Sequence, residues 1–191
     1  MFTIEMLPAQ RGDALSITYG EAGDPHHVLI DGGPKETLDT LERRIAELPG
    51  STNRLELLVV THIDADHIQG VVSLLSGPKR VKLFRDVWFN GFKHLGLLGG
   101  PEGEMLTAEL DQEPGRWNKA FKGGPLVLPD TGKPPTVKLR GGLELTLLTP
   151  DGRGAGQAGA EVGEGGAQGR PRAGCGRAGS ADVETRGVPR L

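Results

Sequence analysis

Alternating apolar and polar residues predict paired β-strands at the start of the chain. Apolar residues alternate with polar ones over residues 2–6, and the alternation resumes over residues 15–19 after a turn at residues 11–13. A third apolar run, residues 27–30, leads into a glycine turn at residues 31–33. This order predicts an N-terminal meander of three strands.

The apolar spacing then changes to the period of a helix. Leu38, Leu41, Ile45 and Leu48 fall on one helical face, and charged residues occupy the other face. We expect this helix to lie over the sheet, before the next strand.

A short, strongly apolar segment, residues 55–60, predicts a buried strand that stops at His62. Beyond it, apolar residues recur at helical spacing up to residue 75, so His67 is predicted to open a helix that Gly77-Pro78 ends. A strand, a polar loop and a helix in this order direct the side chains of the loop into one cleft.

Four potential metal ligands crowd this loop. His62, Asp64, Asp66 and His67 place two imidazoles and two carboxylates within six residues. Imidazole nitrogen and carboxylate oxygen are the usual ligands of a hydrolytic zinc ion, and carboxylates shift the preference towards manganese or magnesium. The alternative is a solvated turn that holds two histidines by chance. The apolar strand before the cluster and the helix after it favour a metal site.

The segment 61–70, with its Thr-His-x-Asp-x-Asp-His-x-x-Gly pattern, resembles the metal-binding signature of the metallo-β-lactamase superfamily. The usual signature has a histidine where this chain has Asp64, and aspartate at that position resembles the branch related to the C-terminal domain of the DNA-uptake protein ComEC. The upstream Asp-Gly-Gly at 31–33 and Gly-Asp-Ala at 12–14 look like further elements of that branch. The resemblance covers residues 2 to about 77.

The resemblance implies an α+β fold of the αββα sandwich type, of which only the first half is recognisable. By the same resemblance, His62 and Asp64 belong to a first metal ion, and Asp66 and His67 belong to a second. The implied cofactor is zinc, two ions in a complete site, with manganese as the alternative. The implied activity is hydrolysis, in which metal-activated water attacks an ester or phosphodiester and Asp66 also orients the nucleophile. The family's later ligands have no counterpart after His94.

Several other residues carry two interpretations each. Asp31 either supports the metal site or forms a turn, and Asp13 is interpreted as structural. His26 and His27, at the start of a strand, are interpreted as surface residues rather than ligands. His94 either reaches the cleft or caps a loop, and the loop interpretation is favoured.

Residues 81–150 continue the same domain. We expect strand segments at residues 81–83 and 87–89, a long irregular loop over residues 96–115, and a β-hairpin over residues 137–147. Cations interleave with aromatic residues in the segment 116–122, a pattern that fits either nucleic-acid contacts or an ordinary amphipathic helix turn.

The composition changes after Pro150. Residues 151–191 contain no aromatic residue and hold about a dozen of the 31 glycines in the chain. Such a composition does not bury enough apolar area to offset the entropy of ordering, so it predicts a disordered tail after a single domain over residues 1–150. The tail is either an ordinary flexible extension or a frameshifted translation of a GC-rich gene.

Charge and targeting signals limit the partners. A net charge of −3 argues against broad electrostatic binding to nucleic acid, although a local basic patch remains compatible with it. No apolar stretch approaches the ~18 residues of a membrane span, and the start of the chain has no signal-peptide pattern, so we expect a cytoplasmic protein.

Two functions follow from these patterns. The first is a metal-dependent hydrolase that acts on a small-molecule or phosphodiester substrate, nucleic acid included. The second is a truncated, non-catalytic remnant or interaction protein that retains a partial metal site.

Overall fold

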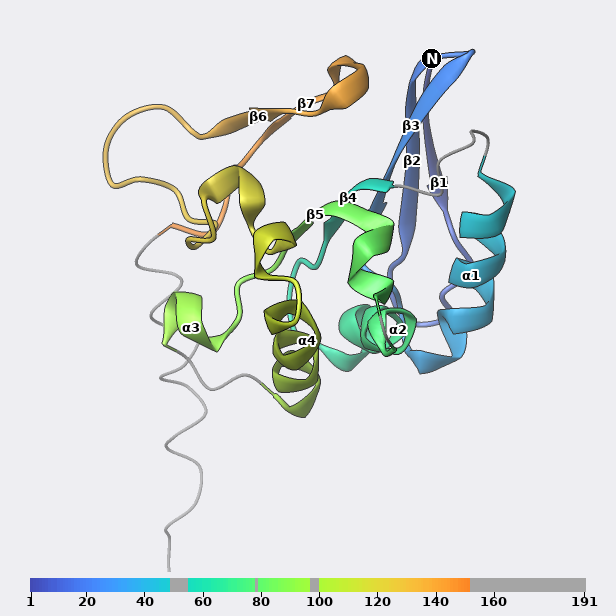
Figure 1. Cartoon of the computed structure of the whole chain (residues 1–191), viewed down its shortest axis with the longest axis horizontal. Coiled ribbons are helices and arrows are strands. Elements are labelled where there is room, and N and C mark those ends of the chain that lie inside the picture. The colour runs from blue at the N-terminus through green and yellow to red at the C-terminus, as the bar shows by residue number, and fades with distance from the viewer. Residues whose placement is uncertain (49–54, 78, 97–99, 152–191) are drawn as a thin grey trace, which may run out of the picture.

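The computed structural model describes residues 1–48, 55–77, 79–96 and 100–151 (Figure 1). The predicted disordered tail begins at residue 151, and from residue 152 onwards it lies outside the described residues.

One mixed sheet organises the chain. Its strands lie in the order in which they occur in the sequence, and β1 to β3 form the predicted antiparallel meander, whereas β3, β4 and β5 are parallel. The strands are β1 (Phe2–Met6), β2 (Leu15–Glu21), β3 (Asp24–Ile30), β4 (Leu55–Val59) and β5 (Phe84–Trp88). A separate two-stranded antiparallel sheet confirms the predicted hairpin, with β6 (Thr136–Lys138) and β7 (Glu144–Thr146).

The helices confirm the two that the sequence predicts and add others. α1 (Leu38–Glu47) and α2 (Ala65–Leu75) connect the parallel strands, as the helical spacing indicates. The added α-helices are α3 (Phe92–Leu95) and α4 (Pro101–Asp111), and the 3₁₀ turns are η1 (Lys35–Thr37), η2 (Arg80–Leu83), η3 (Pro114–Arg116), η4 (Lys119–Phe121) and η5 (Arg140–Gly142). A five-stranded mixed sheet with these helices confirms the predicted α+β class.

Different elements cover the two faces of the sheet. Leu29 and Leu58 point to the face where α2 and α4 bury their apolar residues, and the apolar residues of α1 border the same cluster. Their chain neighbours Val28 and Leu57 point to the opposite face, towards Leu126 and the apolar residues of the β6–β7 hairpin. Figure 1 shows α1, α2 and α4 grouped together and the hairpin away from them. The central strands are therefore buried on both faces.

Two sequence predictions are wrong in the region after β4. The expected strand segment at residues 81–83 is the 3₁₀ turn η2, and the expected irregular loop over residues 96–115 contains α4. Pro101 occupies the first turn of α4. Its fixed φ suits a helix start, and N–H groups in the first turn have no acceptor within the helix, so the missing N–H of proline costs no hydrogen bond there. Leu106 and Leu110 are fully buried against α2, so tertiary packing stabilises a helix whose composition suggests a loop.

None of the helices in the described part of the chain is long and apolar enough to cross a membrane.

A close backbone contact joins the glycine turn after β3 to α2. The Gly32 N–H donates to the carbonyl of His67, and the Gly70 N–H donates to the carbonyl of Gly33, both at 2.9 Å. A Cβ on Gly70 would lie 1.9 Å from the Gly32 carbonyl oxygen, closer than any real Cβ contact. Glycine at position 70 is therefore a steric requirement of this approach.

Replacing Gly70 by alanine should destabilise the fold. We expect Gly70→Ala to lower the free energy of unfolding by about 2–4 kcal/mol, because the gain in helix propensity is smaller than the cost of the clash. Urea unfolding followed by circular dichroism measures this difference.

Gly103 in α4 provides the matched control. A Cβ there would make an ordinary 3.4 Å contact with the Ile63 side chain. Gly103→Ala should therefore be neutral or stabilising by up to about 1 kcal/mol. Equal destabilisation by the two substitutions would contradict the steric explanation.

Candidate metal site

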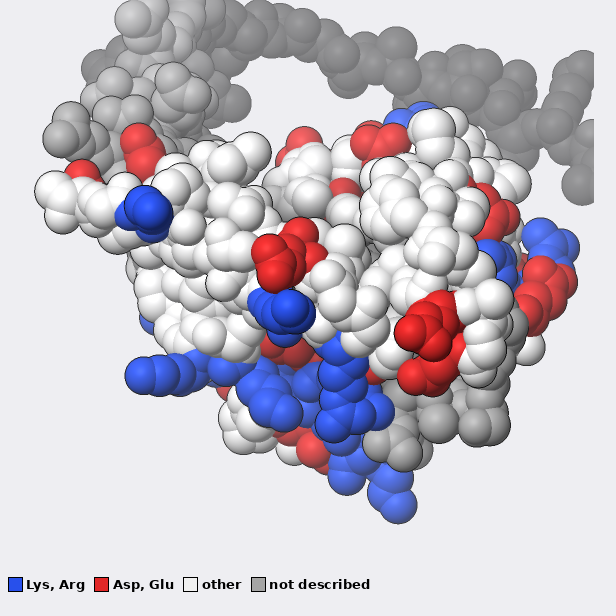
Figure 2. All heavy atoms as spheres, turned by 90° about the horizontal axis from the view of Figure 1, so that it is seen from above, with Lys and Arg blue, Asp and Glu red and all other residues white. Residues whose placement is uncertain are grey.

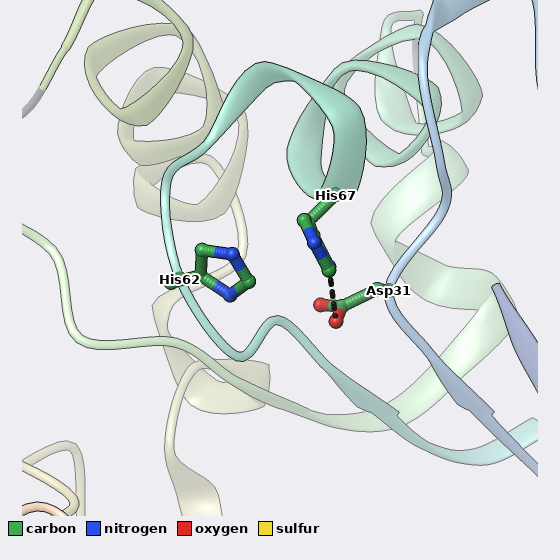
Figure 3. A group of neighbouring side chains, drawn as sticks. All are labelled: Asp31, His62 and His67. Atoms are coloured by element: carbon green, nitrogen blue, oxygen red, sulfur yellow. Dashed lines mark hydrogen bonds and ion pairs between the residues drawn. The ribbon is translucent and has the colours of Figure 1, made fainter. Parts of the chain in front are cut away.

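The site lies where two parallel strands end. Asp31 follows β3, His62 lies in the loop after β4, and His67 occupies the first turn of α2 (Figure 3). Because β3 and β4 are parallel neighbours, their carboxyl ends meet at one edge of the sheet. The fold thus brings together residues that lie more than 30 positions apart in the sequence.

Asp31 is the buried centre of a hydrogen-bond network. Its Oδ1 accepts the Thr61 N–H at 2.8 Å, and its Oδ2 accepts the Thr61 hydroxyl at 2.6 Å. The same Oδ2 lies 3.1 Å from Nδ1 of His67. The residue is 3% exposed and has a left-handed φ of 56°, which aspartate tolerates better than most residues. Asp31 therefore has the left-handed backbone of a turn former and also holds Thr61 and His67, and its support of a metal site stays a prediction.

The network assigns the tautomers of both histidines. An ionised Asp31 only accepts, so Nδ1 of His67 must donate to it. The Thr61 hydroxyl uses its hydrogen on Asp31, so its oxygen accepts from Nδ1 of His62, 2.7 Å away. Each neutral ring then carries its proton on Nδ1, and each Nε2 retains a free lone pair. This is the arrangement of metal-binding histidines, which donate their other N–H to a carboxylate or a similar acceptor.

Asp31, His62 and His67 form a group that could hold a metal ion. Each offers a ligand atom, and these atoms lie within 4.8 Å of one another. The two imidazole rings approach to 3.9 Å between centroids with an interplanar angle of 48°. Both oxygens of Asp31 already accept hydrogen bonds. The imidazoles are therefore the better candidates to bind an ion; Asp31 orients His67 directly and His62 through the Thr61 hydroxyl.

The two carboxylates of the motif lie outside this group. Oδ2 of Asp64 is 3.6 Å from Nε2 of His62, and its side chain is 73% exposed. Asp64 is also the N-cap residue of α2, but its carboxylate makes no capping hydrogen bond. Asp66 occupies the first turn of α2. Metal ligation by Asp64 and Asp66, and the catalytic role of Asp66, stay predictions.

The histidine pair on β3 is not a surface feature, so that sequence interpretation is wrong. His27 is 5% exposed, and its Nδ1 lies 3.0 Å from the Thr18 hydroxyl. Nδ1 of His26 lies 3.1 Å from the buried carboxylate of Glu56, which also pairs with Arg85 at 3.0 Å. These contacts come from neighbouring strands, which the local sequence does not reveal.

His94 holds a loop, as the sequence interpretation favoured. Its Nδ1 accepts the Gly91 N–H at 3.2 Å, and its Nε2 lies 3.1 Å from the Gly123 carbonyl, to which it donates. Burial lowers the pKa of the imidazole, which agrees with a ring whose Nδ1 must stay unprotonated to accept. Neither nitrogen is free for a metal ion.

The aromatic residues of the segment 116–122 are not available to nucleobases. Trp117 is 1% exposed and stacks on Phe89, while Phe121 meets Trp88 edge to face. The segment is a pair of 3₁₀ turns rather than one amphipathic helix turn. Figure 2 shows Lys and Arg side chains gathered at one side of the face that it draws, with Asp and Glu side chains beside them. Trp117 is therefore part of the core, and Phe121 is partly buried against Trp88, so neither ring forms an open stacking platform in this structure.

A scan of protein-family models and a search of curated proteins found no match to this chain. The candidate site consequently rests on its own geometry.

The tautomer assignment is testable by NMR. In metal-free protein at about pH 8, where free histidine is mostly neutral, long-range ¹H–¹⁵N correlation spectra should show His62 and His67 protonated on Nδ1. Thr61→Val removes the hydroxyl and should abolish the Nδ1–H preference of His62, whereas Thr61→Ser should retain it. Protons on Nε2 of both rings in the unmodified protein would contradict the assignment.

Proposed function

We propose that the chain is a metal-dependent hydrolase of the metallo-β-lactamase type, with His62 and His67 as the first ligands of its metal ion. One observation carries the proposal. Two imidazoles from different elements lie 3.9 Å apart between ring centroids, and the Thr61 hydroxyl and the buried Asp31 carboxylate hold their Nδ1 atoms. Histidines that bind metal ions are held in the same way, by an acceptor on the ring nitrogen that does not bind the ion.

The position of Asp64 supports a cation at the site. In the assigned tautomer, Nε2 of His62 is an acceptor, and it faces the Asp64 carboxylate oxygen at 3.6 Å. An ion bound by this nitrogen would therefore lie next to that carboxylate. We propose Asp64 as a further ligand for this reason, and Asp66 as the carboxylate that the family resemblance assigns to a second ion.

A bound zinc or manganese ion would supply Lewis acidity and an activated water for attack on an ester or phosphodiester. The chain's own residues do the positioning. Asp31 fixes the orientation of His67, and Thr61 fixes that of His62. The exposed flank of the site, where the Asp64 carboxylate lies, leaves room for substrate to approach.

The way the main sheet is covered supports the proposal, which also draws on the family resemblance. A sandwich of the αββα type places helices on the outer face of each sheet and packs the sheets against each other. Here α2 and α4 cover one face of the main sheet, and the β6–β7 hairpin begins a second layer on the other. A phosphodiester or nucleic acid is the favoured substrate class, because the motif resembles that of the ComEC-like branch.

A non-catalytic remnant is the second candidate, and one observation favours it. Within the described ranges, the Asp31–His62–His67 group is the one cluster of three or more His, Cys, Asp or Glu side chains suited to a metal ion. Both nitrogens of His94 are engaged elsewhere. A complete two-ion site needs more ligands than this group supplies.

Metal titration tests the proposed ligands. Chelator-stripped protein should bind Zn²⁺ in isothermal titration calorimetry, and His62→Ala or His67→Ala should weaken that binding by more than about 100-fold, because each deletes a ligand rather than a supporting group. His26→Gln is the matched control, since this histidine lies outside the group, and it should leave the affinity unchanged. Equal affinities in all of these proteins would refute the site.

Turnover separates the two candidate functions. Hydrolysis of bis-p-nitrophenyl phosphate should appear when Zn²⁺ or Mn²⁺ is restored and should vanish in His67→Ala. Asp66→Asn tests the predicted catalytic carboxylate and should lower kcat/KM by at least about 100-fold. Metal binding without any turnover would identify the chain as the remnant.

A further inference from the structure

β1 is an open edge of the main sheet. Within the described ranges its one sheet neighbour is β2, and all of its residues are exposed there. The opposite edge, β5, differs, because Trp117 forms a parallel β-bridge with Val87 and the turns η3 and η4 lie alongside it. Among the described residues, β1 is thus the sheet edge left open to another strand.

The register shows which backbone groups of β1 face outwards. Met6 lies opposite Leu15, and one residue further the Leu7 N–H donates to the Ala14 carbonyl at 2.8 Å. In an antiparallel pair, hydrogen-bonded residues alternate with non-bonded ones, so odd-numbered residues of β1 bond to β2. The Met1 amino group accordingly donates to the Gly20 carbonyl. The N–H and C=O groups of Phe2, Ile4 and Met6 therefore point to the free edge.

The same three residues present apolar side chains. Phe2, Ile4 and Met6 are 58%, 56% and 75% exposed, and they share one face of the strand. Ile4 lies opposite Ile17, so this face continues the apolar cluster under the β6–β7 hairpin. An exposed edge with alternating apolar residues and no proline or lysine is a template for strand addition.

We propose that β1 pairs antiparallel with β1 of a second copy of this chain, with the two-fold axis at Ile4. This register places Phe2 opposite Met6 of the partner subunit and Ile4 opposite Ile4 of the partner subunit. All outward N–H and C=O groups of β1 then find partners, and the interface is isologous, which closes it as a dimer. The apolar side chains of the two strands become lateral neighbours.

The charges of β1 select this register. Glu5 lies on the opposite face of the strand, where its carboxylate pairs with Nε of Arg44 at 2.7 Å. In the proposed register, Glu5 faces Thr3 of the partner subunit. Outward-facing residues of β1 are two positions apart, so the nearest alternative registers differ by two residues. In one of them Glu5 lies opposite Glu5 of the partner subunit, and like charges directly opposite are unfavourable. A shift in the other direction leaves Met6 without a partner.

Sedimentation velocity of the full chain tests the proposal. A short edge interface belongs to the small, transient class, below about 1,200 Å² of buried surface. We therefore expect a monomer–dimer equilibrium between about 10 and 500 µM protein. Ile4→Lys should weaken dimerisation at least tenfold, because it opposes two charges at the axis. Met105→Lys, at a 53% exposed residue of α4, is the matched control and should leave dimerisation unchanged.

Two further variants test strand pairing itself. Ile4→Pro removes only an outward N–H, so it should abolish the dimer while thermal unfolding confirms that the monomer remains folded. In a Cys175→Ser background, Ile4→Cys should form an intermolecular disulfide under mild oxidation, because hydrogen-bonded partners place their Cα atoms about 5.5 Å apart. Thr3→Cys in the same background should not, because its counterpart is not directly opposite.

Each remaining outcome would overturn the proposal. A monomer at every concentration would do so, as would a dimer that survives both Ile4→Lys and Ile4→Pro. A dimer lost in Ile4→Lys but retained in a folded Ile4→Pro would indicate face-to-face contact instead of edge pairing. Cross-linking by Thr3→Cys equal to that by Ile4→Cys would reject the register. Assemblies larger than a dimer would reject a closed two-fold interface.

Discussion

The candidate site depends on the close approach between the glycine turn after β3 and helix α2. Gly32 and Gly70 have no side chains, so the two backbone segments come into direct contact. Hydrogen bonds join the segments there. This contact brings the first turn of α2 against the carboxyl end of β3, which places His67 within hydrogen-bonding distance of Asp31. Any side chain at the contact would move α2 away and separate the imidazole from the carboxylate that orients it.

Burial decreases across the site in an order that suits its proposed chemistry. Asp31 is fully buried and accepts hydrogen bonds on both oxygens, so its charge is compensated and its position is fixed. His67 is partly buried, whereas His62 and Asp64 are exposed. The network therefore has a rigid base and an open rim, and exposed carboxylates at the rim adjust to an ion more easily than buried ones do.

The two faces of the main sheet are covered to different extents. Helices cover one face, and the β6–β7 hairpin covers the middle of the other, so β3 and β4 have buried apolar residues on both faces. The hairpin does not reach β1, whose apolar side chains stay exposed. This asymmetry, together with the outward backbone groups of β1, makes the edge strand the part of the sheet best suited to contact another chain. The candidate metal site lies elsewhere on the sheet, at the carboxyl ends of β3 and β4, and no residue of β1 contributes to it.

Local pattern alone determined the strands of the meander, helices α1 and α2, the β6–β7 hairpin and the two histidines of the site, because period and residue type are properties of neighbouring residues. Tertiary structure decided the rest. α4 forms because Leu106 and Leu110 are buried against α2, and the half-buried His26 pairs with Glu56 because β4 lies beside β3. From the sequence alone, Asp31 could be either a turn-forming residue or a residue that supports the metal site. Only the parallel pairing of β3 with β4, which sets residues 30 positions apart side by side, makes it the acceptor that orients both the loop and the helix.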